Sequence, residues 1–183
     1  ASKAGMVNHF LLVADAVHTP VYVYNVPGRT GVSLTYEALA EISQHKNIVG
    51  IKEASGNISA VAALAEACGN SLDIYSGNDD QIVPILSLGG KGVISVLSNV
   101  VPKDTHDIVA LWNEGKTKES LAIQLKYLDL INALFCEVNP VPVKTAMGLM
   151  GLCADEMRLP LCEMEENNKE RLATALRNHG IID

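Results

Sequence analysis

The chain has 183 residues, of which 48% are hydrophobic and 4% aromatic, and its formal net charge is −7. This composition predicts about one domain with an aliphatic core, and the acidic balance argues against nucleic acid or an anionic membrane as a partner. No apolar run approaches the roughly 20 residues that span a bilayer. The four cysteines form no Cys-x-x-Cys pair, which predicts reduced thiols and a cytoplasmic protein. The five histidines are scattered, so no metal site is expected.

Helical and strand-like patterns alternate through the first hundred residues. Helices are expected at residues 4–17, 35–44, 59–67 and 79–88, and strands at 21–25, 48–52, 72–77 and 92–97. Residues 26–31 are rich in turn formers and are expected to form a loop. This alternation predicts right-handed βαβ units and an α/β fold with four parallel strands.

The strand patterns cease after Pro102. Further helices are expected at residues 103–113, 117–135, 142–150 and 168–178. Gly115 is the predicted boundary, with the α/β layer in residues 1–115 and a helical domain in residues 116–183.

Lys52 ends the short apolar strand that begins at Ile48. Alternation along the strand is expected to place Ile48, Gly50 and Lys52 on one face. An ammonium group between apolar strand walls loses hydration, which lowers its pKa and frees the amine to attack carbonyl groups. The alternative is a lysine that reaches solvent at a strand end, as most lysines do.

Other polar residues follow the carboxyl ends of the neighbouring strands, where ligands gather in parallel α/β folds. Tyr24 and Arg29 follow the first strand, and Gly77 and Asn78 follow the third. A lysine, a phenol and a guanidinium at one edge suit a keto acid, because Lys52 could form an imine, Tyr24 pass protons and Arg29 hold a carboxylate. The alternatives are a strand tyrosine with a satisfied hydroxyl and a solvated loop arginine.

Several motifs together resemble one family. They are Tyr24-Asn-Val-Pro-Gly-Arg-Thr-Gly31, Gly50-Ile-Lys-Glu-Ala-Ser-Gly56, Tyr75-Ser-Gly-Asn-Asp79, Gly92-Val-Ile-Ser-Val96 and Asn139-Pro-Val-Pro-Val-Lys144. In this order they are similar to the dihydrodipicolinate synthase family of Schiff-base-forming aldolases. The resemblance extends over residues 1–183 and implies the second half of a (β/α)8 TIM barrel followed by C-terminal helices.

The resemblance also implies a lyase of lysine and diaminopimelate biosynthesis that needs no cofactor. Pyruvate would form an imine with Lys52, and the derived enamine would attack L-aspartate 4-semialdehyde. Tyr24 resembles the family's proton-relay tyrosine and Arg29 the arginine that binds the semialdehyde carboxylate. Gly77 and the Ile94 backbone resemble groups that line the pyruvate pocket. Asn78 departs mildly from the family, since some members carry Asp there.

The chain is shorter than the resemblance requires, because a barrel of this class needs about 250 residues and eight strands. In the family, the first half of the barrel carries a threonine pair that seats the pyruvate carboxylate and relays protons. A tyrosine contributed across the dimer interface and the lysine-feedback site also lie in that half. We therefore expect this chain to be a C-terminal portion of the enzyme that is inactive alone. Its expected partners are the N-terminal half of the same enzyme and, in a homo-oligomer, further copies that make a dimer or tetramer.

Three other hypotheses remain open. The first is a sibling aldolase, such as an N-acetylneuraminate lyase or a sugar-acid aldolase. The second is a non-catalytic module that only assembles into oligomers. The third is a doubly wound binding domain with an open sheet, which requires helices on both faces and a reversal of strand order.

Overall fold

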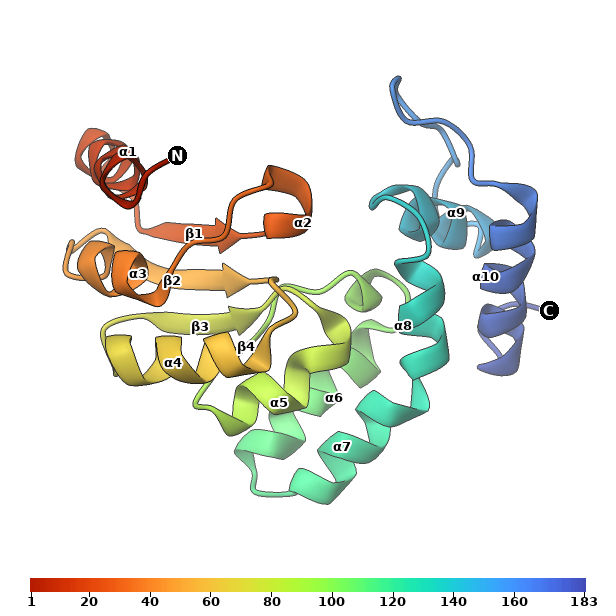
Figure 1. Ribbon diagram of the computed structural model, residues 1–183. Helices are drawn as coiled ribbons and strands as arrows, with labels where there is room; N and C mark the ends of the chain where they lie inside the picture. Colours follow the sequence, from red (N-terminus) through yellow and green to blue (C-terminus); the bar gives the residue numbers. More distant parts are fainter. The chain divides into compact units, whose positions relative to one another are not determined.

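The computed structural model describes residues 1–183, and it divides into two compact units, Ala1–Ile94 and Ser95–Asp183. Unit 1 contains a four-stranded sheet and its covering helices, and unit 2 is helical (Figure 1). No helix combines the length and the apolar character needed to cross a membrane.

Unit 1 alternates helices and strands, as its sequence predicts. Its helices are α1 (Lys3–Ala16), α2 (Pro27–Thr30), α3 (Tyr36–Ile42), α4 (Ile58–Cys68), the 3₁₀ helix η1 (Asp79–Gln81) and α5 (Ile82–Ser87). Its strands are β1 (Val21–Asn25), β2 (Ile48–Glu53), β3 (Asp73–Ser76) and β4 (Gly92–Val93).

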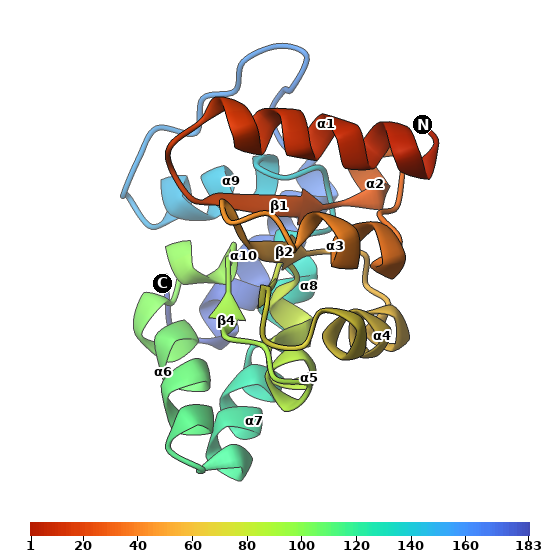
Figure 2. The same ribbon diagram turned by 90° about the vertical axis from the view of Figure 1, so that its left-hand side faces the viewer.

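The sheet has the order β1-β2-β3-β4, and every pair of neighbours is parallel. Figure 2 shows α3 and α4 on the same side of these strands. An open, doubly wound sheet requires its strand order to reverse, and here the order never does. The α/β class and the half-barrel arrangement are therefore confirmed, and the doubly wound hypothesis is wrong.

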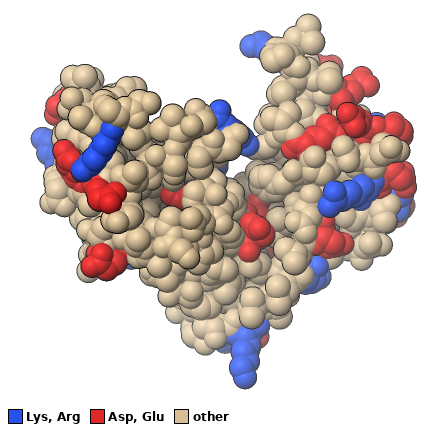
Figure 3. Space-filling model, in the orientation of Figure 1, with Lys and Arg blue, Asp and Glu red and all other residues tan.

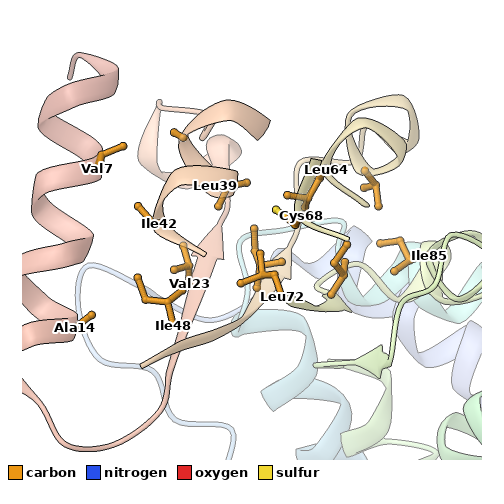
Figure 4. Packing of buried hydrophobic residues seen from close by; sticks show 14 residues of the cluster. Val7, Ala14, Val23, Leu39, Ile42, Ile48, Leu64, Cys68, Leu72 and Ile85 are labelled. Carbon is orange, nitrogen blue, oxygen red and sulfur yellow. The ribbon is translucent and has the colours of Figure 1, made fainter. Parts of the chain in front are cut away.

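The face of the sheet toward the helices carries the apolar core of unit 1. Val23, Ile51 and Ile74 are almost fully buried there and pack with Leu39 and Leu64 of the covering helices (Figure 4). Burying each large aliphatic side chain stabilises the fold by about 1.5–3 kcal/mol, so this layer fixes the strands in place.

Ile48 differs from the expectation that it shares a face with Lys52. It is buried in the helix-side core, near Val23. The cause is a break in the β1–β2 register: Val21 pairs with Ile48, while Tyr22 pairs with Gly50. An extra residue at such a bulge changes which face the following side chains occupy.

Two other local predictions also need correction. The segment expected as a loop at residues 26–31 contains α2, which starts with Pro27 and ends at Gly31 in the left-handed conformation (φ 68°). The strand expected at residues 92–97 ends at Val93, because the chain turns into the 3₁₀ helix η2 (Leu97–Asn99). Proline fits a first helical turn, and glycine fits the left-handed end.

Unit 2 consists of helices around a second apolar core. They are η2, α6 (Pro102–Asn113), α7 (Thr117–Lys126), α8 (Leu128–Leu134), α9 (Val141–Leu149) and α10 (Glu166–Asn178). The core includes Leu97, Leu130 and Leu172, each fully buried. Acidic side chains gather on the face of unit 2 shown in Figure 3.

Tyr127 divides the helix that was expected to run from residue 117 to 135. It is 4% exposed, its hydroxyl donates to Asp104 of α6, and its ring lies 4.7 Å from that of His179. His179 in turn contacts Asp129 of α8, with Nε2 and Oδ1 2.7 Å apart. The buried tyrosine thus links three helices, and these tertiary contacts override the continuous helical pattern.

The compact units divide between Ile94 and Ser95, whereas the sequence places a domain boundary at residue 115. Gly115 adopts φ 79° and lies in the turn between α6 and α7, which pack against each other. The boundary at 115 stays a prediction.

Candidate active site

Lys52 lies on the face of β2 that points away from the helices, near the carboxyl end of the strand. It pairs in register with Tyr24 of β1 and Tyr75 of β3. Burial lowers the pKa of Lys52, and the positive charge of Arg29 lowers it further. Asp79 acts in the opposite direction. A neutral amine is therefore more accessible here than on a surface lysine, which is the property that imine formation needs.

Tyr24 lies beside this amine on the adjacent strand. The Nζ atom of Lys52 is 4.5 Å from the centroid of the Tyr24 ring. The ring is 39% exposed, because it stands on the open face of the sheet rather than in the core. A phenol beside an amine is a candidate for proton exchange.

Arg29 lies on α2, which follows directly after β1. The side chain of Thr30 holds this turn by donating to the Val32 carbonyl oxygen at 2.8 Å. Arg29 is exposed, yet close enough to Lys52 to lower the pKa of its amine. A guanidinium beside a nucleophilic amine can bind a carboxylate with its planar fork.

Gly77 closes the site from the end of β3. Its backbone nitrogen donates to the Glu53 carbonyl oxygen at 2.7 Å. A Cβ atom at this position would lie 2.7 Å from the Ala54 Cβ and 3.1 Å from the Lys52 Cε. A side chain here would collide with Ala54 and crowd the Lys52 Cε and the Glu53 carbonyl oxygen.

Asn78 and Ile94 lie at the same end of the sheet. The Asn78 nitrogen donates to the Ser76 hydroxyl at 3.2 Å, and the Ile94 nitrogen donates to the Ser76 carbonyl oxygen at 2.8 Å. The Ile94 side chain is 42% exposed. All six residues predicted for the site therefore occur at the carboxyl ends of the strands or in the segments that follow them.

The sequence reasoning missed a buried polar pair on the other side of the sheet. Asn25 and Glu53 are each 4% exposed, and the Asn25 Nδ2 donates to the Glu53 Oε2 at 2.8 Å. The other Glu53 oxygen accepts from the Ser55 nitrogen at 2.6 Å, and the Asn25 Oδ1 accepts from the Leu34 nitrogen at 3.1 Å. Each residue directly follows a predicted site residue, so the pair holds the strand ends beside Tyr24 and Lys52.

Two cavities in unit 1 border the site without including Lys52. One, of about 450 Å³, lies on the helix side and reaches Asn25 and Glu53. The other, of about 420 Å³, is lined by Tyr24, Thr30 and the start of α1. No group of three or more His, Cys, Asp or Glu side chains could hold a metal ion.

Comparisons with known proteins agree with this geometry. Residues 1–179 match the model of the dihydrodipicolinate synthetase family. The chain is 51% identical over 179 residues to a 4-hydroxy-tetrahydrodipicolinate synthase of Clostridium novyi (strain NT), covering 98% of this chain and 60% of that relative. It thus spans about 60% of the length of the curated relatives it matches.

Solved structures of dihydrodipicolinate synthases match this chain over a similar share of their length. The dihydrodipicolinate synthase of Thermotoga maritima superimposes with a TM-score of 0.96 at 38% identity, over 100% of this chain and 63% of that one. The synthase of Acinetobacter baumannii, solved in complex with pyruvate, also gives a TM-score of 0.96 at 38% identity, over 100% and 62% of the two chains. The match confirms the predicted fold.

Proposed function

Because the chain belongs to the dihydrodipicolinate synthetase family, we propose that it carries the imine-forming part of a 4-hydroxy-tetrahydrodipicolinate synthase. The complete enzyme would condense pyruvate with L-aspartate 4-semialdehyde and supply lysine and diaminopimelate biosynthesis. The observation that carries this proposal is Lys52, an amine with a lowered pKa, placed 4.5 Å from the centre of the Tyr24 ring.

The first step joins pyruvate to Lys52. The neutral amine attacks the ketone carbon, a C–N bond forms, and the carbonyl oxygen takes up protons and leaves as water. Tyr24, whose ring centre lies 4.5 Å from the Lys52 Nζ, passes protons between the amine and this oxygen. Gly77 supports the step by leaving space beside the Lys52 Cε.

The second step makes the new carbon–carbon bond. The imine loses a proton from the pyruvate methyl group to give an enamine, whose terminal carbon attacks the aldehyde carbon of the semialdehyde. The aldehyde oxygen then takes up a proton. Arg29 would bind the carboxylate of the second substrate, while Asn78 and the Ile94 backbone would line the pocket.

We propose that an N-terminal portion of the same enzyme completes the barrel. The open face of the sheet supports this, since Tyr22 is 45% and Tyr24 39% exposed, and β1 is an edge strand with one unpaired side. The completed protein would form a dimer or tetramer. We expect the 183-residue chain alone to show no measurable synthase turnover.

Pyruvate trapping tests the proposal on this chain. The chain is incubated with pyruvate and borohydride, with and without a polypeptide that corresponds to the remaining N-terminal part of the Clostridium novyi relative. One reduced pyruvate should be added, and peptide mapping should locate it at Lys52. Lys52→Arg should abolish the adduct because arginine offers no free amine, whereas the control Lys46→Arg should not.

Two further measurements sharpen the test. Tyr24→Phe should leave the adduct possible but slow it by about 10²–10⁴-fold, the range that general acid–base catalysis contributes. Labelling at Lys91 or Lys144 in place of Lys52 would show that the assignment is wrong. Turnover of a sugar acid but not of aspartate semialdehyde by the reconstituted protein would favour a sibling aldolase, and no adduct at all would favour an assembly module.

A further inference from the structure

Three more residues on the open face of the sheet surround Lys52, and none of them belongs to the predicted site. They are Tyr22 of β1, Gly50 of β2 and Tyr75 of β3. The register places Tyr75 directly beside Lys52, and it places Tyr22 beside Gly50, two residues before Lys52 on the same face.

The Tyr22 ring lies across the backbone of Gly50. A Cβ atom at Gly50 would sit 2.1 Å from the Tyr22 Cε1 and 2.5 Å from its Cδ1. Real carbon atoms do not approach so closely, so the ring occupies the space that any side chain at Gly50 would fill. Glycine at this position lets the ring cross from β1 to β2 beneath Lys52.

The same ring continues to β3. Tyr22 and Tyr75 meet edge to face, with ring centroids 5.8 Å apart and planes at 71°. Aromatic pairs prefer this geometry, which stabilises them beyond the area they bury. Burial and the neighbouring Tyr75 and Asp73 raise the pKa of Tyr22, so its hydroxyl stays protonated near neutral pH.

The surroundings of Lys52 on this face follow from these placements. The Tyr24 ring centre lies 4.5 Å from its Nζ, Tyr75 pairs with it on β3, the Tyr22 ring covers Gly50 two residues before it, and Gly77 lies against its Cε. The open face itself would become the interior of the completed barrel, so a substrate would approach the amine from the carboxyl ends of the strands.

We propose that Tyr22 and Tyr75 are positioning residues of the imine-forming reaction. Their two rings, called the floor below, cover the open face on the side of Lys52 that is nearer the amino ends of the strands. The floor directs the Lys52 side chain toward the carboxyl ends of the strands and keeps water away from that side of it. This inference rests on the proposed function, because it assigns the floor a role in presenting the amine to pyruvate.

The test measures the acidity of Lys52 without pyruvate. Lysines are labelled with an amine-reactive reagent at a series of pH values, and peptide mapping gives the labelling midpoint of Lys52 beside those of surface lysines in the same sample. Tyr22→Leu and Tyr75→Leu should each raise the Lys52 midpoint by about half to one pH unit, which is about a three- to tenfold loss of neutral amine below the midpoint.

Two control variants separate the ring from other effects. Tyr22→Phe keeps the ring and should leave the Lys52 midpoint in place. Tyr36→Leu removes a tyrosine of the same 45% exposure at the start of α3 and should also leave it in place. The charged groups that face Lys52, Arg29 and Asp79, are unchanged in all four variants.

The outcomes distinguish the floor from the proposed function. If the Lys52 midpoint is unchanged in folded Tyr22→Leu and Tyr75→Leu proteins, the proposed role of the two rings is wrong. It is also wrong if Tyr22→Phe raises the Lys52 midpoint as much as Tyr22→Leu does. In the trapping experiment, Tyr22→Leu should slow the pyruvate adduct at Lys52 about three- to tenfold at neutral pH. A wild-type protein that forms no Lys52 adduct would overturn the proposed function itself, whatever the midpoints show.

Discussion

The buried pair of Asn25 and Glu53 permits a quantitative test of what holds the strand ends together. Four groups meet there: the Glu53 oxygens accept from the Asn25 side chain and the Ser55 backbone, and the Asn25 oxygen accepts from the Leu34 backbone. Every donor faces an acceptor. The perturbation exchanges amide and carboxylate, first at one position and then at both.

Glu53→Gln keeps the shape of the side chain but replaces one acceptor with a donor. The new amide group must face either the Ser55 nitrogen or the Asn25 Nδ2, both donors. Rotating the Asn25 amide would only move the conflict to the Leu34 nitrogen. At 4% exposure little water can compensate, so we expect a loss of about 2–4 kcal/mol from one charge-assisted hydrogen bond and one unsatisfied donor.

Asn25→Asp alone places two acceptors face to face instead of two donors, because two carboxylates then meet in a buried site. We expect a loss of at least 2 kcal/mol at neutral pH, of the kind that an uncompensated buried charge causes. Combining both substitutions restores every hydrogen bond with the polarity of the pair reversed. The double variant should lie within about 1 kcal/mol of wild type, giving a coupling energy of about 3 kcal/mol or more.

Urea unfolding followed by far-UV circular dichroism measures all four proteins. With a slope of about 1–3 kcal/mol/M, each single variant should shift the midpoint down by about 1–2 M, and the double variant should recover most of it. If the double variant is as unstable as the sum of the single variants, the hydrogen bond between positions 25 and 53 does not stabilise the strand ends and the reasoning is wrong.

Three other substitutions test separate parts of the structure. Gly77→Ala should cost about 1–3 kcal/mol in urea unfolding, because its Cβ would lie 2.7 Å from the Ala54 Cβ, and it should slow the pyruvate adduct because it also crowds the Lys52 Cε; unchanged stability would contradict the tight packing. The Tyr127 hydroxyl holds the pKa of Asp104 below its ordinary value, so the stability from this carboxylate is present above about pH 4 and lost as pH falls through the folded-state pKa. Asp104→Asn should therefore lower the urea midpoint at pH 7 more than at pH 3, and an equal effect at both would refute the assignment. Ile51→Ala, at a fully buried core position, should cost about 2–5 kcal/mol by the same assay, and a loss below 1 kcal/mol would contradict its role in the core.

Local patterns were sufficient to predict most of the secondary structure. The strand at residues 21–25 coincides with β1, and the lysine strand ends within one residue of β2. The predictions were wrong where contacts between residues far apart in the sequence determine the secondary structure. Tyr127 breaks a continuous helical pattern because its ring and hydroxyl have partners on α6 and near the end of α10, which no local periodicity reveals.

The candidate site was predicted in part for the same reason. Lys52 and Tyr24 could be proposed from the sequence because each stands at a strand end next to a recognisable turn. Asn25 and Glu53 pair across 28 residues of sequence, so only the register of β1 and β2 shows that they meet. The Tyr22 ring was missed because the signal was a glycine, Gly50, whose meaning depends on what fills the space above it.

The bulge at the start of β2 determines where in this strand the protein can lose or gain a residue during evolution. Beyond it, Gly50, Lys52 and their partners alternate strictly, so deleting one residue between them would turn the amine into the apolar core and expose Glu53 instead. At the bulge itself, Val49 has no partner on β1, so the loss or gain of a residue there would change the bulge and not the pairing of Gly50 and Lys52. The turn before it is fixed by Asn47, whose side chain donates to the carbonyl oxygens of Ala14 and Val17. We therefore expect natural length variation in this strand to occur at the bulge and not between Gly50 and Lys52.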